Sequence, residues 1–330
     1  MTDIANIVLS IFGLIGIGYS TARIGLLGQE VGKGLADFVF TIAIPVLLFK
    51  TLASADFGIA APWRIWSAYF AGVGLTWTLS HIAIRRLFKR DARAGVVAGL
   101  SGSYGNIVLI GIPLVQTAFG EAGMVSLLII IAVHLTVMML ASLILFEWAL
   151  RVDGVASGAV DRGAIWRRFI TNLARNPIVI GVLTGIVWRL ADLPVAGVPA
   201  MLIDPLAQIA GPVALFATGM GLARYGIARN VPQALVITVF KLGAMPAIVQ
   251  AAGWTIGLAP LGIAVATLAA ACPTGVNPFL IAGRFGTGEA IASNAIAIST
   301  AAGFASIAIW LAILQRLFNL VPVAGGFPPA

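Results

Sequence analysis

Long apolar runs alternate with short polar breaks along this chain, and most of the runs are long enough to cross a lipid bilayer. A helix of about 20 apolar residues spans the hydrocarbon core of a membrane. Glycine and proline mark most of the joints between runs, as they do at helix ends. The pattern predicts ten spans, which run roughly over 4–22, 35–53, 63–84, 94–118, 123–148, 177–191, 201–223, 232–257, 260–284 and 290–317.

Composition leads to the same class of protein. Of the 330 residues, 60% are hydrophobic and 10% are charged, and the mean hydropathy is +1.04. A soluble domain is about a quarter charged, so this chain has too little polar surface to cover a soluble globule. The alternating ten-residue segments of a membrane β-barrel are absent from the sequence. We therefore predict an all-α integral membrane protein with the lipid bilayer as its surroundings.

The basic residues are unevenly distributed between alternate loops, and this sets the predicted orientation. One set of loops and span ends carries Arg23, Lys33, Arg85, Arg86, Lys89, Arg90, Arg93, Arg151, Arg162, Arg167, Arg168, Arg175, Arg224, Arg229 and Arg284. The positive-inside rule places this set in the cytoplasm. The net charge of +8 is then a mark of topology and not of nucleic-acid binding. We predict a multi-pass protein of the inner (plasma) membrane with both termini outside the cytoplasm.

Two segments carry the same pattern at a constant spacing. The residues Asp37, Pro45, Val46, Leu48 and Phe49 recur as Asp204, Pro212, Val213, Leu215 and Phe216, and 204 − 37 = 167 for the first pair as for the others. The polar connection 151–175 separates five spans in 1–150 from five spans in 176–330. An odd number of spans in each copy inverts the second copy relative to the first, an arrangement typical of transporters. We expect Asp37 and Asp204 to cap the helices they begin.

Phe119-Gly120 resembles Phe285-Gly286, and both pairs stand where the fourth span of a half turns into the fifth. This second similarity extends the predicted duplication towards the end of each half.

The fourth and ninth spans are the most interrupted. The fourth contains Ser101-Gly102-Ser103-Tyr104-Gly105-Asn106 and then Pro113, and the ninth contains Pro273-Thr274-Gly275-Val276-Asn277-Pro278. Glycine and proline weaken or break a helix. Broken backbone at membrane depth is tolerated only where it is buried in protein or lines a wet cavity. We predict that the two broken helices cross near the middle of the bilayer.

The residue types at the breaks favour an anion site. Asparagine is a preferred N-cap and proline suits the first helical position, so Asn277 and Pro278 predict a half-helix start. Asn106 has the same part in the fourth span, although whether Asn106 or Pro113 marks the crossing is open. Two half-helix N-termini attract an anion, and the asparagine amides can donate to a carboxylate. The predicted substrate site comprises Asn106, Asn277, Tyr104, Ser103, Thr274 and Gly275, and the residues predicted to shape the crossing are Gly105, Pro113, Pro273 and Pro278.

These motifs resemble the auxin efflux carrier family, which includes plant auxin transporters and bacterial permeases proposed for malonate and malate. The resemblance covers nearly the whole chain and is carried by the stretches 106–114, 273–282 and 38–45. It implies a scaffold of spans 1, 2, 6 and 7 and a moving domain of spans 3–5 and 8–10. It also implies an elevator-like shift and an organic anion as substrate. The short central connection departs from the long loop of the plant proteins.

Two ionisable residues lie within predicted spans. Lys241 is about ten residues into the eighth span, where a charge is costly and usually faces a cavity or a partner. It could attract the anion, stand in for a coupling cation, or extend along its stem towards the interface. His134 is similarly deep in the fifth span, where it could couple transport to protons or be a neutral histidine between helices.

The sequence bears on several other classes of function. A sodium- or proton-coupled symporter or antiporter of the bile-acid type remains an alternative, although the crossing has no carboxylate. We find no catalytic set, metal motif or cofactor motif, so neither an enzyme nor a bound metal or cofactor is expected. No filter motif of a channel is visible. Gly181 and Gly185 form a small-residue face that could pack helices within one subunit or in a homodimer.

Overall fold

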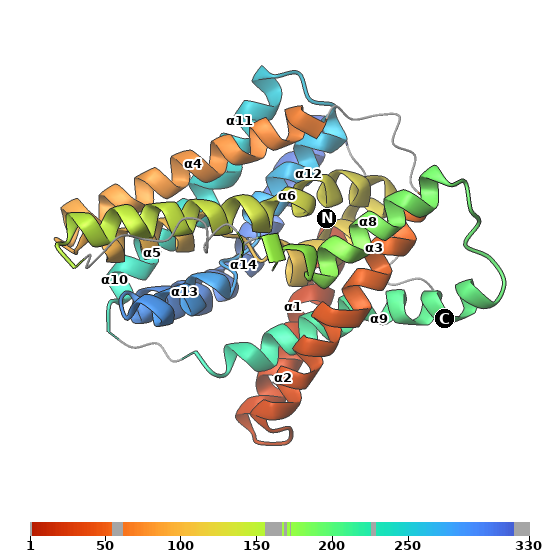
Figure 1. The fold of residues 1–330 in the computed structure, drawn as a ribbon, viewed down its shortest axis with the longest axis horizontal. Helices are drawn as coiled ribbons and strands as arrows, with labels where there is room; N and C mark the ends of the chain where they lie inside the picture. The colour runs from red at the N-terminus through yellow and green to blue at the C-terminus, as the bar shows by residue number, and fades with distance from the viewer. Residues whose placement is uncertain are drawn as a thin grey trace.

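The computed structural model describes residues 2–54, 62–155, 167, 170–171, 173–225 and 229–319, and every regular element in that part of the chain is a helix (Figure 1). The α-helices, and three π-helical segments labelled η, are α1 (Thr2–Arg23), α2 (Gln29–Phe38), η1 (Val39–Ala43), α3 (Ile44–Ala53), α4 (Pro62–Leu87), α5 (Ala92–Ser103), η2 (Ile107–Gly111), α6 (Ile112–Val152), α8 (Pro177–Leu190), α9 (Val198–Leu222), α10 (Val231–Val239), η3 (Phe240–Ala244), α11 (Met245–Thr255), α12 (Pro260–Ala271), α13 (Asn277–Phe285) and α14 (Glu289–Phe318).

The helices fall where the apolar runs predict them. Six stretches of the described chain are long and apolar enough to cross a membrane: Asp3–Arg23, Gln29–Ala53, Ile107–Val152, Val198–Leu222, Val231–Thr255 and Glu289–Phe318. Two further apolar helices, α8 and α12, are shorter, with 14 and 12 residues. The chain is therefore an all-helical, multi-pass membrane protein. Arg162 and Arg168 of the predicted connection lie outside the described residues.

The three π-helical segments share one sequence feature. Each ends two residues before a proline, which is Pro45 after η1, Pro113 after η2 and Pro246 after η3. Proline has no N–H to donate and its ring crowds the preceding turn. A wider turn with i→i+5 bonds accommodates this defect while the helix continues. Proline thus deforms these spans locally without ending them.

Two glycines turn the chain at equivalent places. Gly120 interrupts α6 with φ 60° and ψ −153°, and Gly286 ends α13 with φ 62°. Positive φ is strained for residues that carry a Cβ atom, which explains glycine at both positions. The predicted joint between the fourth and fifth spans is thus found at Gly120. The Phe119-Gly120 and Phe285-Gly286 pairs therefore share a positive φ at glycine, whereas ψ is −153° at Gly120 and 30° at Gly286.

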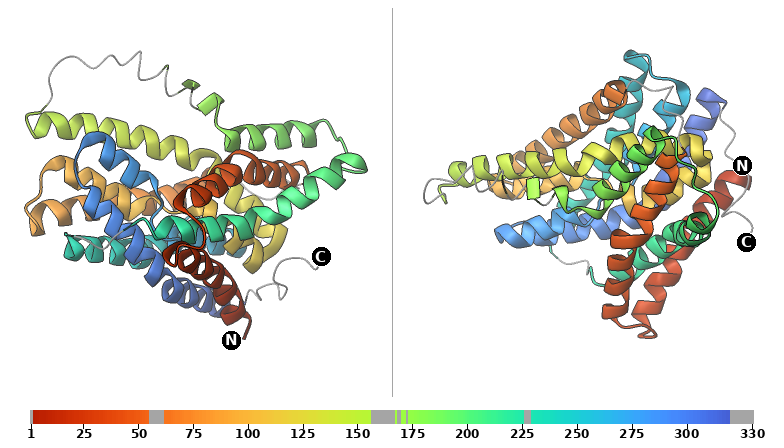
Figure 2. Two further views of the ribbon diagram at one scale, coloured as in Figure 1. Left: turned by 90° about the horizontal axis from the view of Figure 1, so that it is seen from below. Right: turned by 45° about the vertical axis from the view of Figure 1, so that its right-hand side comes forward.

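The helices pack in two groups. In one group α1 packs on α9, α3 packs on α8, and α2 and α3 also contact α9. In the other, α4 contacts α5 and α11, α12 lies against α11 and α6, and α10 contacts α14. Figure 1 shows α3, α8 and α9 on the right and α4, α5, α10 and α13 on the left, and Figure 2 gives two further views.

Glycines allow the closest approaches inside the first group. Gly18 of α1 faces the backbone of Phe216 on α9, and Gly185 of α8 faces the backbone of Phe49 on α3. A Cβ atom at either glycine would collide with the facing carbonyl. Both glycines and both phenylalanines are separated by the repeat spacing, since 185 − 18 = 167 and 216 − 49 = 167. The two helix contacts therefore involve the same residue types at the same spacing of 167.

The contacts in this group correct the predicted capping role of Asp37 and Asp204 and show what the face of Gly181 and Gly185 packs against. Asp37 lies near the end of α2 and Asp204 inside α9, so neither caps a helix start. The helices begin earlier than predicted, and the Asp204 carboxylate pairs with Lys50 at 2.8 Å. Gly181 faces Pro45 of the same chain, as Gly185 faces Phe49. The small-residue face therefore packs helices within one subunit.

Candidate functional site

Both predicted breaks are present, and they touch. α5 ends at Ser103, η2 starts at Ile107, α12 ends at Ala271 and α13 starts at Asn277. Between these ends the two chain segments form an isolated antiparallel bridge between Gly105 and Thr274. We call the junction formed by residues 104–106 and 272–276 the crossover. It brings four helix ends to one place.

Backbone hydrogen bonds hold the crossover together. The N–H of Asn106 donates to the carbonyl of Pro273 at 2.7 Å, and the N–H of Gly275 donates to the carbonyl of Tyr104 at 2.9 Å. Each extended segment thus satisfies backbone groups of the other, which is what a break inside a membrane protein requires. Gly105 and Gly275 suit this approach because a Cβ at either position would press on neighbouring atoms.

Several donors remain at the two half-helix starts. The first N–H groups of a helix have no intrahelical acceptor. The Asn106 side chain caps one helix, because its Oδ1 accepts from the N–H of Leu109 at 3.3 Å. The N–H groups of Ile107, Val108 and Asn277 have no acceptor among the described residues. With its oxygen on Leu109, the Asn106 amide also keeps its two N–H bonds free to donate.

The Asn277 side chain does not cap its helix as predicted. The helix starts one residue earlier than predicted, so Val276 is the cap residue and Asn277 and Pro278 are the first two helical residues. The Asn277 amide instead donates to the Tyr104 hydroxyl across the crossover. A hydroxyl that accepts this bond still has its own proton to give. Asn106, Tyr104 and Asn277 are each only partly buried.

The hydroxyl groups of two other predicted site residues donate to backbone carbonyl groups of the protein. Ser103 is buried and donates to the carbonyl of Gly99 in its own helix at 2.8 Å. Thr274 is buried and donates to the carbonyl of Ser101 at 2.8 Å. The Thr274 contact joins the two broken spans, whereas the Ser103 contact stays within α5. Ser299, which the sequence did not single out, accepts from the N–H of Thr274 at 3.0 Å; a serine in an apolar span is too common a feature to have predicted this contact.

The three prolines predicted to shape the crossing lie in different parts of the two broken spans. Pro273 lies in the crossover, and Pro278 follows directly in α13. Pro113 lies beyond η2 in the first turn of α6, so Asn106 and not Pro113 marks the crossing. The reason is that a π-helical segment absorbs the defect of Pro113, whereas Gly105 and Asn106 leave the helical conformation.

An open cavity of about 980 Å³ lies between the two helix groups. Its walls come from α3, α8 and α9 on one side and from α4, α6 and α12 on the other. Among the predicted site residues only Pro113 lines it. Its polar lining includes Lys50, Arg64, Gln116 and Gln208. None of these four was predicted as a site residue, because no motif distinguishes them. The cavity thus lies between the two groups and includes polar side chains from both.

The two ionisable residues of the spans are both buried in the second group. Lys241 lies in η3 and its ammonium donates to the carbonyl of Ala270. The ring of His134 on α6 packs against the ring of Tyr104 in a tilted arrangement and against the ring of Tyr69 edge to face, with centroids 4.8 and 5.6 Å away. Neither ring nitrogen of His134 has a hydrogen-bond partner in the described part of the chain. Lys241 thus contacts the broken ninth span directly, at Ala270. His134 contacts the break in the fourth span through the ring of Tyr104.

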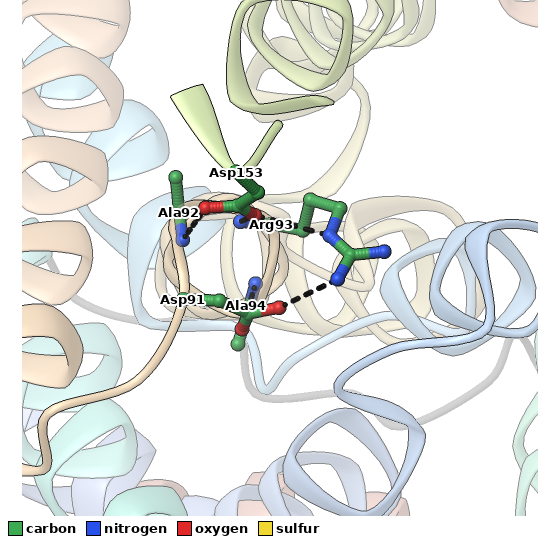
Figure 3. A network of polar contacts seen from close by, with 5 residues as sticks. All are labelled: Asp91, Ala92, Arg93, Ala94 and Asp153. Carbon is green, nitrogen blue, oxygen red and sulfur yellow. Dashed lines mark hydrogen bonds and ion pairs between the residues drawn. The ribbon is translucent and has the colours of Figure 1, made fainter. Parts of the chain in front are cut away.

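A polar network fixes the start of the half-helix α5, which is the end away from the crossover (Figure 3). The Asp153 carboxylate accepts from the N–H groups of Ala92 and Arg93 at 2.8 and 3.0 Å, and from Arg93 Nε at 3.0 Å. Asp91 caps α5 through the N–H of Ala94. Burial raises the pKa of the Asp153 carboxyl, but these hydrogen bonds and the guanidinium charge outweigh burial and hold the pKa below its usual value.

Comparison with known proteins places the chain among membrane transporters. The sequence profile described as "Membrane transport protein" matches residues 3–311. A "Putative malonate transporter" of Rhizobium meliloti (strain 1021) is 30% identical over 325 residues, covering 93% of this chain and 94% of that protein. An "Uncharacterized transporter" of Methanothermobacter thermautotrophicus is 24% identical over 310 residues, covering 93% of this chain and 97% of that protein. The family and both relatives are transporters and not enzymes. The chain therefore belongs to the membrane transport protein family, the auxin efflux carrier family that its motifs resemble.

Proposed function

We propose that this membrane transporter is a secondary transporter of small organic anions, with the substrate carboxylate bound at the crossover. The observation that carries the proposal is the pair of half-helix N-termini whose free donors face the same junction. The free N–H groups are those of Ile107, Val108 and Asn277. Helix N-termini with unpaired N–H groups are ready anion sites. The amide of Asn106 and the hydroxyl of Tyr104 add side-chain donors beside them.

Small dicarboxylates such as malonate are the substrate class we favour, and auxin-like weak acids belong to the same chemistry. The relative from Rhizobium meliloti bears the name of a malonate transporter. Carboxylates suit the site because it offers hydrogen-bond donors and dipoles and has no acidic side chain beside it. The donors are neutral groups, so binding does not require an arginine clamp.

The ten-helix inverted repeat is the architecture we propose for this function. Three observations support it: the five residue pairs at a spacing of 167, the positive φ of glycine in the similar pairs Phe119-Gly120 and Phe285-Gly286, and the matching contacts of Gly18 and Gly185. The crossover then lies at the interface of the two copies, where substrate sites of such transporters are found.

The two packing groups correspond to a scaffold and a moving domain in this proposal. The scaffold contains α1, α2, α3, α8 and α9, and the moving domain contains the crossover helices with α4, α6, α10, α11 and α14. The cavity between the groups supports an elevator-like shift, because it leaves polar space along their boundary on one face. Basic residues at the end of α4, among them Arg85, Arg86 and Lys89, support a cytoplasmic location for the opposite face and non-cytoplasmic termini.

The test is uptake of radiolabelled malonate into proteoliposomes that contain the purified protein. Asn106→Ala and Asn277→Ala should each reduce uptake by at least tenfold. Asn176→Ala is the matched control, because Asn176 caps α8 through the N–H of Ile178 but lies away from the crossover. Its loss costs about 1 kcal/mol of helix capping, as at Asn106. Unchanged uptake in both crossover variants would remove the proposed site.

A further inference from the structure

A buried cation, Lys241, stands beside the crossover. Lys241 has 0% of its surface exposed, although lysine is almost never fully buried unless it is paired. Its Nζ donates to the carbonyl oxygen of Ala270 and lies 3.4 Å from the sulfur of Met245. A carbonyl and a thioether together supply no negative charge, so the ammonium is solvated but not neutralised by these contacts.

The position of the ammonium is tied to the broken ninth span. Ala270 lies in the last turn of α12, where the final carbonyl groups have no intrahelical donor and the helix dipole is negative. A Cβ atom placed on Gly105 would lie 3.4 Å from Lys241 Nζ. The ammonium therefore lies beside Gly105 of the bridge, at the same junction as the half-helix N-termini.

No protein carboxylate compensates this charge in the described part of the chain. The ion pairs found there do not include Lys241. The ionisable neighbours that interact with Lys241 are Cys272 and His134, and neither is a carboxylic acid. An uncompensated charge is expensive inside a protein. A bound anion would supply the missing countercharge.

No residue of the crossover carries a carboxylate for a diffusible coupling cation. Metal and sodium sites use several oxygen ligands, often with a carboxylate. Here the Ala270 carbonyl, an oxygen of the kind that would bind such a cation, is already taken by the Lys241 ammonium. The Lys241 ammonium therefore binds a carbonyl oxygen that a diffusible cation could otherwise bind, and this charge is covalently attached to the chain.

We infer that Lys241 is a tethered counter-cation for the transported carboxylate, held at the end of α12 in place of a diffusible coupling ion. This inference rests on the proposed function, because it assumes that the carboxylate binds at the crossover. The ammonium need not touch the carboxylate, since a charge acts over several ångströms in a medium of low dielectric constant. Binding then requires no sodium, and the moving domain carries one positive charge less when a monoanion is bound.

Two measurements on the purified full-length protein test the inference. The first is the affinity of the wild type for malonate, succinate and malate, measured by ligand-induced thermal stabilisation in sodium buffer and in choline buffer. The second is the same titration with Lys241→Met, which keeps a long unbranched chain without charge, and with Lys241→Ala in the presence of methylammonium. Lys33→Met is the control, because Lys33 is exposed on α2.

We expect wild-type affinity in the two buffers to agree within twofold. Lys241→Met should bind at least tenfold more weakly, Lys33→Met should match the wild type, and methylammonium should restore binding in Lys241→Ala. A sodium requirement in the wild type would overturn the inference, even if Lys241→Met does not fold, and would leave the crossover site standing. Wild-type affinity in Lys241→Met would also overturn it. A wild type that responds to none of the three acids would overturn the proposed function and the inference together.

Discussion

Gly275→Ala perturbs the crossover through one added methyl group. A Cβ at this position would lie 3.0 Å from Cδ1 and 3.1 Å from Cε1 of Tyr104, and 3.5 Å from the backbone nitrogen of Asn106. Carbon atoms in contact are normally about 3.5–4.0 Å apart. The Tyr104 ring must therefore move by roughly half an ångström or more. Because the Tyr104 hydroxyl accepts from Asn277, this movement displaces two of the proposed substrate donors together.

The expected size of the effect follows from overpacking. Inserting a methyl group into a well-packed region costs about 1–3 kcal/mol. If the site must pay about 1.4 kcal/mol to regain its geometry on binding, affinity falls about tenfold. We predict a malonate affinity roughly tenfold weaker for Gly275→Ala, measured by ligand-induced thermal stabilisation and by uptake into proteoliposomes.

Gly283→Ala is the matched control for this experiment. Gly283 lies in the helix that starts at the crossover, and a Cβ there meets only Glu289 Oε1 at 3.8 Å, which is an ordinary contact. Alanine in a helix interior is favoured over glycine by about 0.5–1 kcal/mol, so this variant should be as stable as the wild type or more so. Wild-type binding by Gly275→Ala, or an equal loss in both variants, would refute the reasoning.

Three further predictions concern the ends and walls of the site. Asp153→Asn should destabilise the protein by about 1–2 kcal/mol at pH 7, because it removes charge-assisted hydrogen bonds in a pair where Arg93 remains 23% exposed. The folded-state pKa of Asp153 is lowered, so its stabilisation is present above the unfolded pKa of about 3.9 and disappears as the pH falls through the folded pKa. The melting temperatures of variant and wild type should therefore converge in that pH range. Gly219→Ala should lower the melting temperature because its Cβ would collide with the Ile15 carbonyl, whereas Gly221→Ala on the same helix meets nothing within 4 Å and should not. Arg64→Gln should slow malonate uptake at low ionic strength by about two- to fivefold and leave it unchanged at high salt, because Arg64 lines the cavity and has no carboxylate partner among the described residues.

The spans were predictable because membranes restrict the backbone so strongly. Every N–H and C=O in hydrocarbon needs a partner, so each long apolar run becomes a helix, and interruption by glycine, proline and asparagine marks the exceptions. The breaks at 104–106 and 272–276 were found for this reason. The pairing of Gly105 with Thr274 was only expected as a crossing, because the sequence does not give the register of a contact between distant segments.

The errors came from local boundaries and from contacts made in three dimensions. Asp37 and Asp204 were assigned as caps because they precede apolar runs, but the helices extend into the polar flanks, and Asp204 finds Lys50 instead. The shift of one residue at Asn277 changed its role from a cap to a partner of Tyr104. The link from Lys241 to Ala270 joins helices 29 residues apart and had no sequence signal beyond a lysine in an apolar span.

The most direct test of the central claim is to locate a bound carboxylate. Crystals grown with a saturating concentration of bromosuccinate would show the bromine in an anomalous difference map. The account predicts a peak at the crossover, within hydrogen-bonding reach of a carboxylate held by Asn106 and Asn277. A peak confined to the cavity beside Arg64 and Gln208, with none at the crossover, would contradict it.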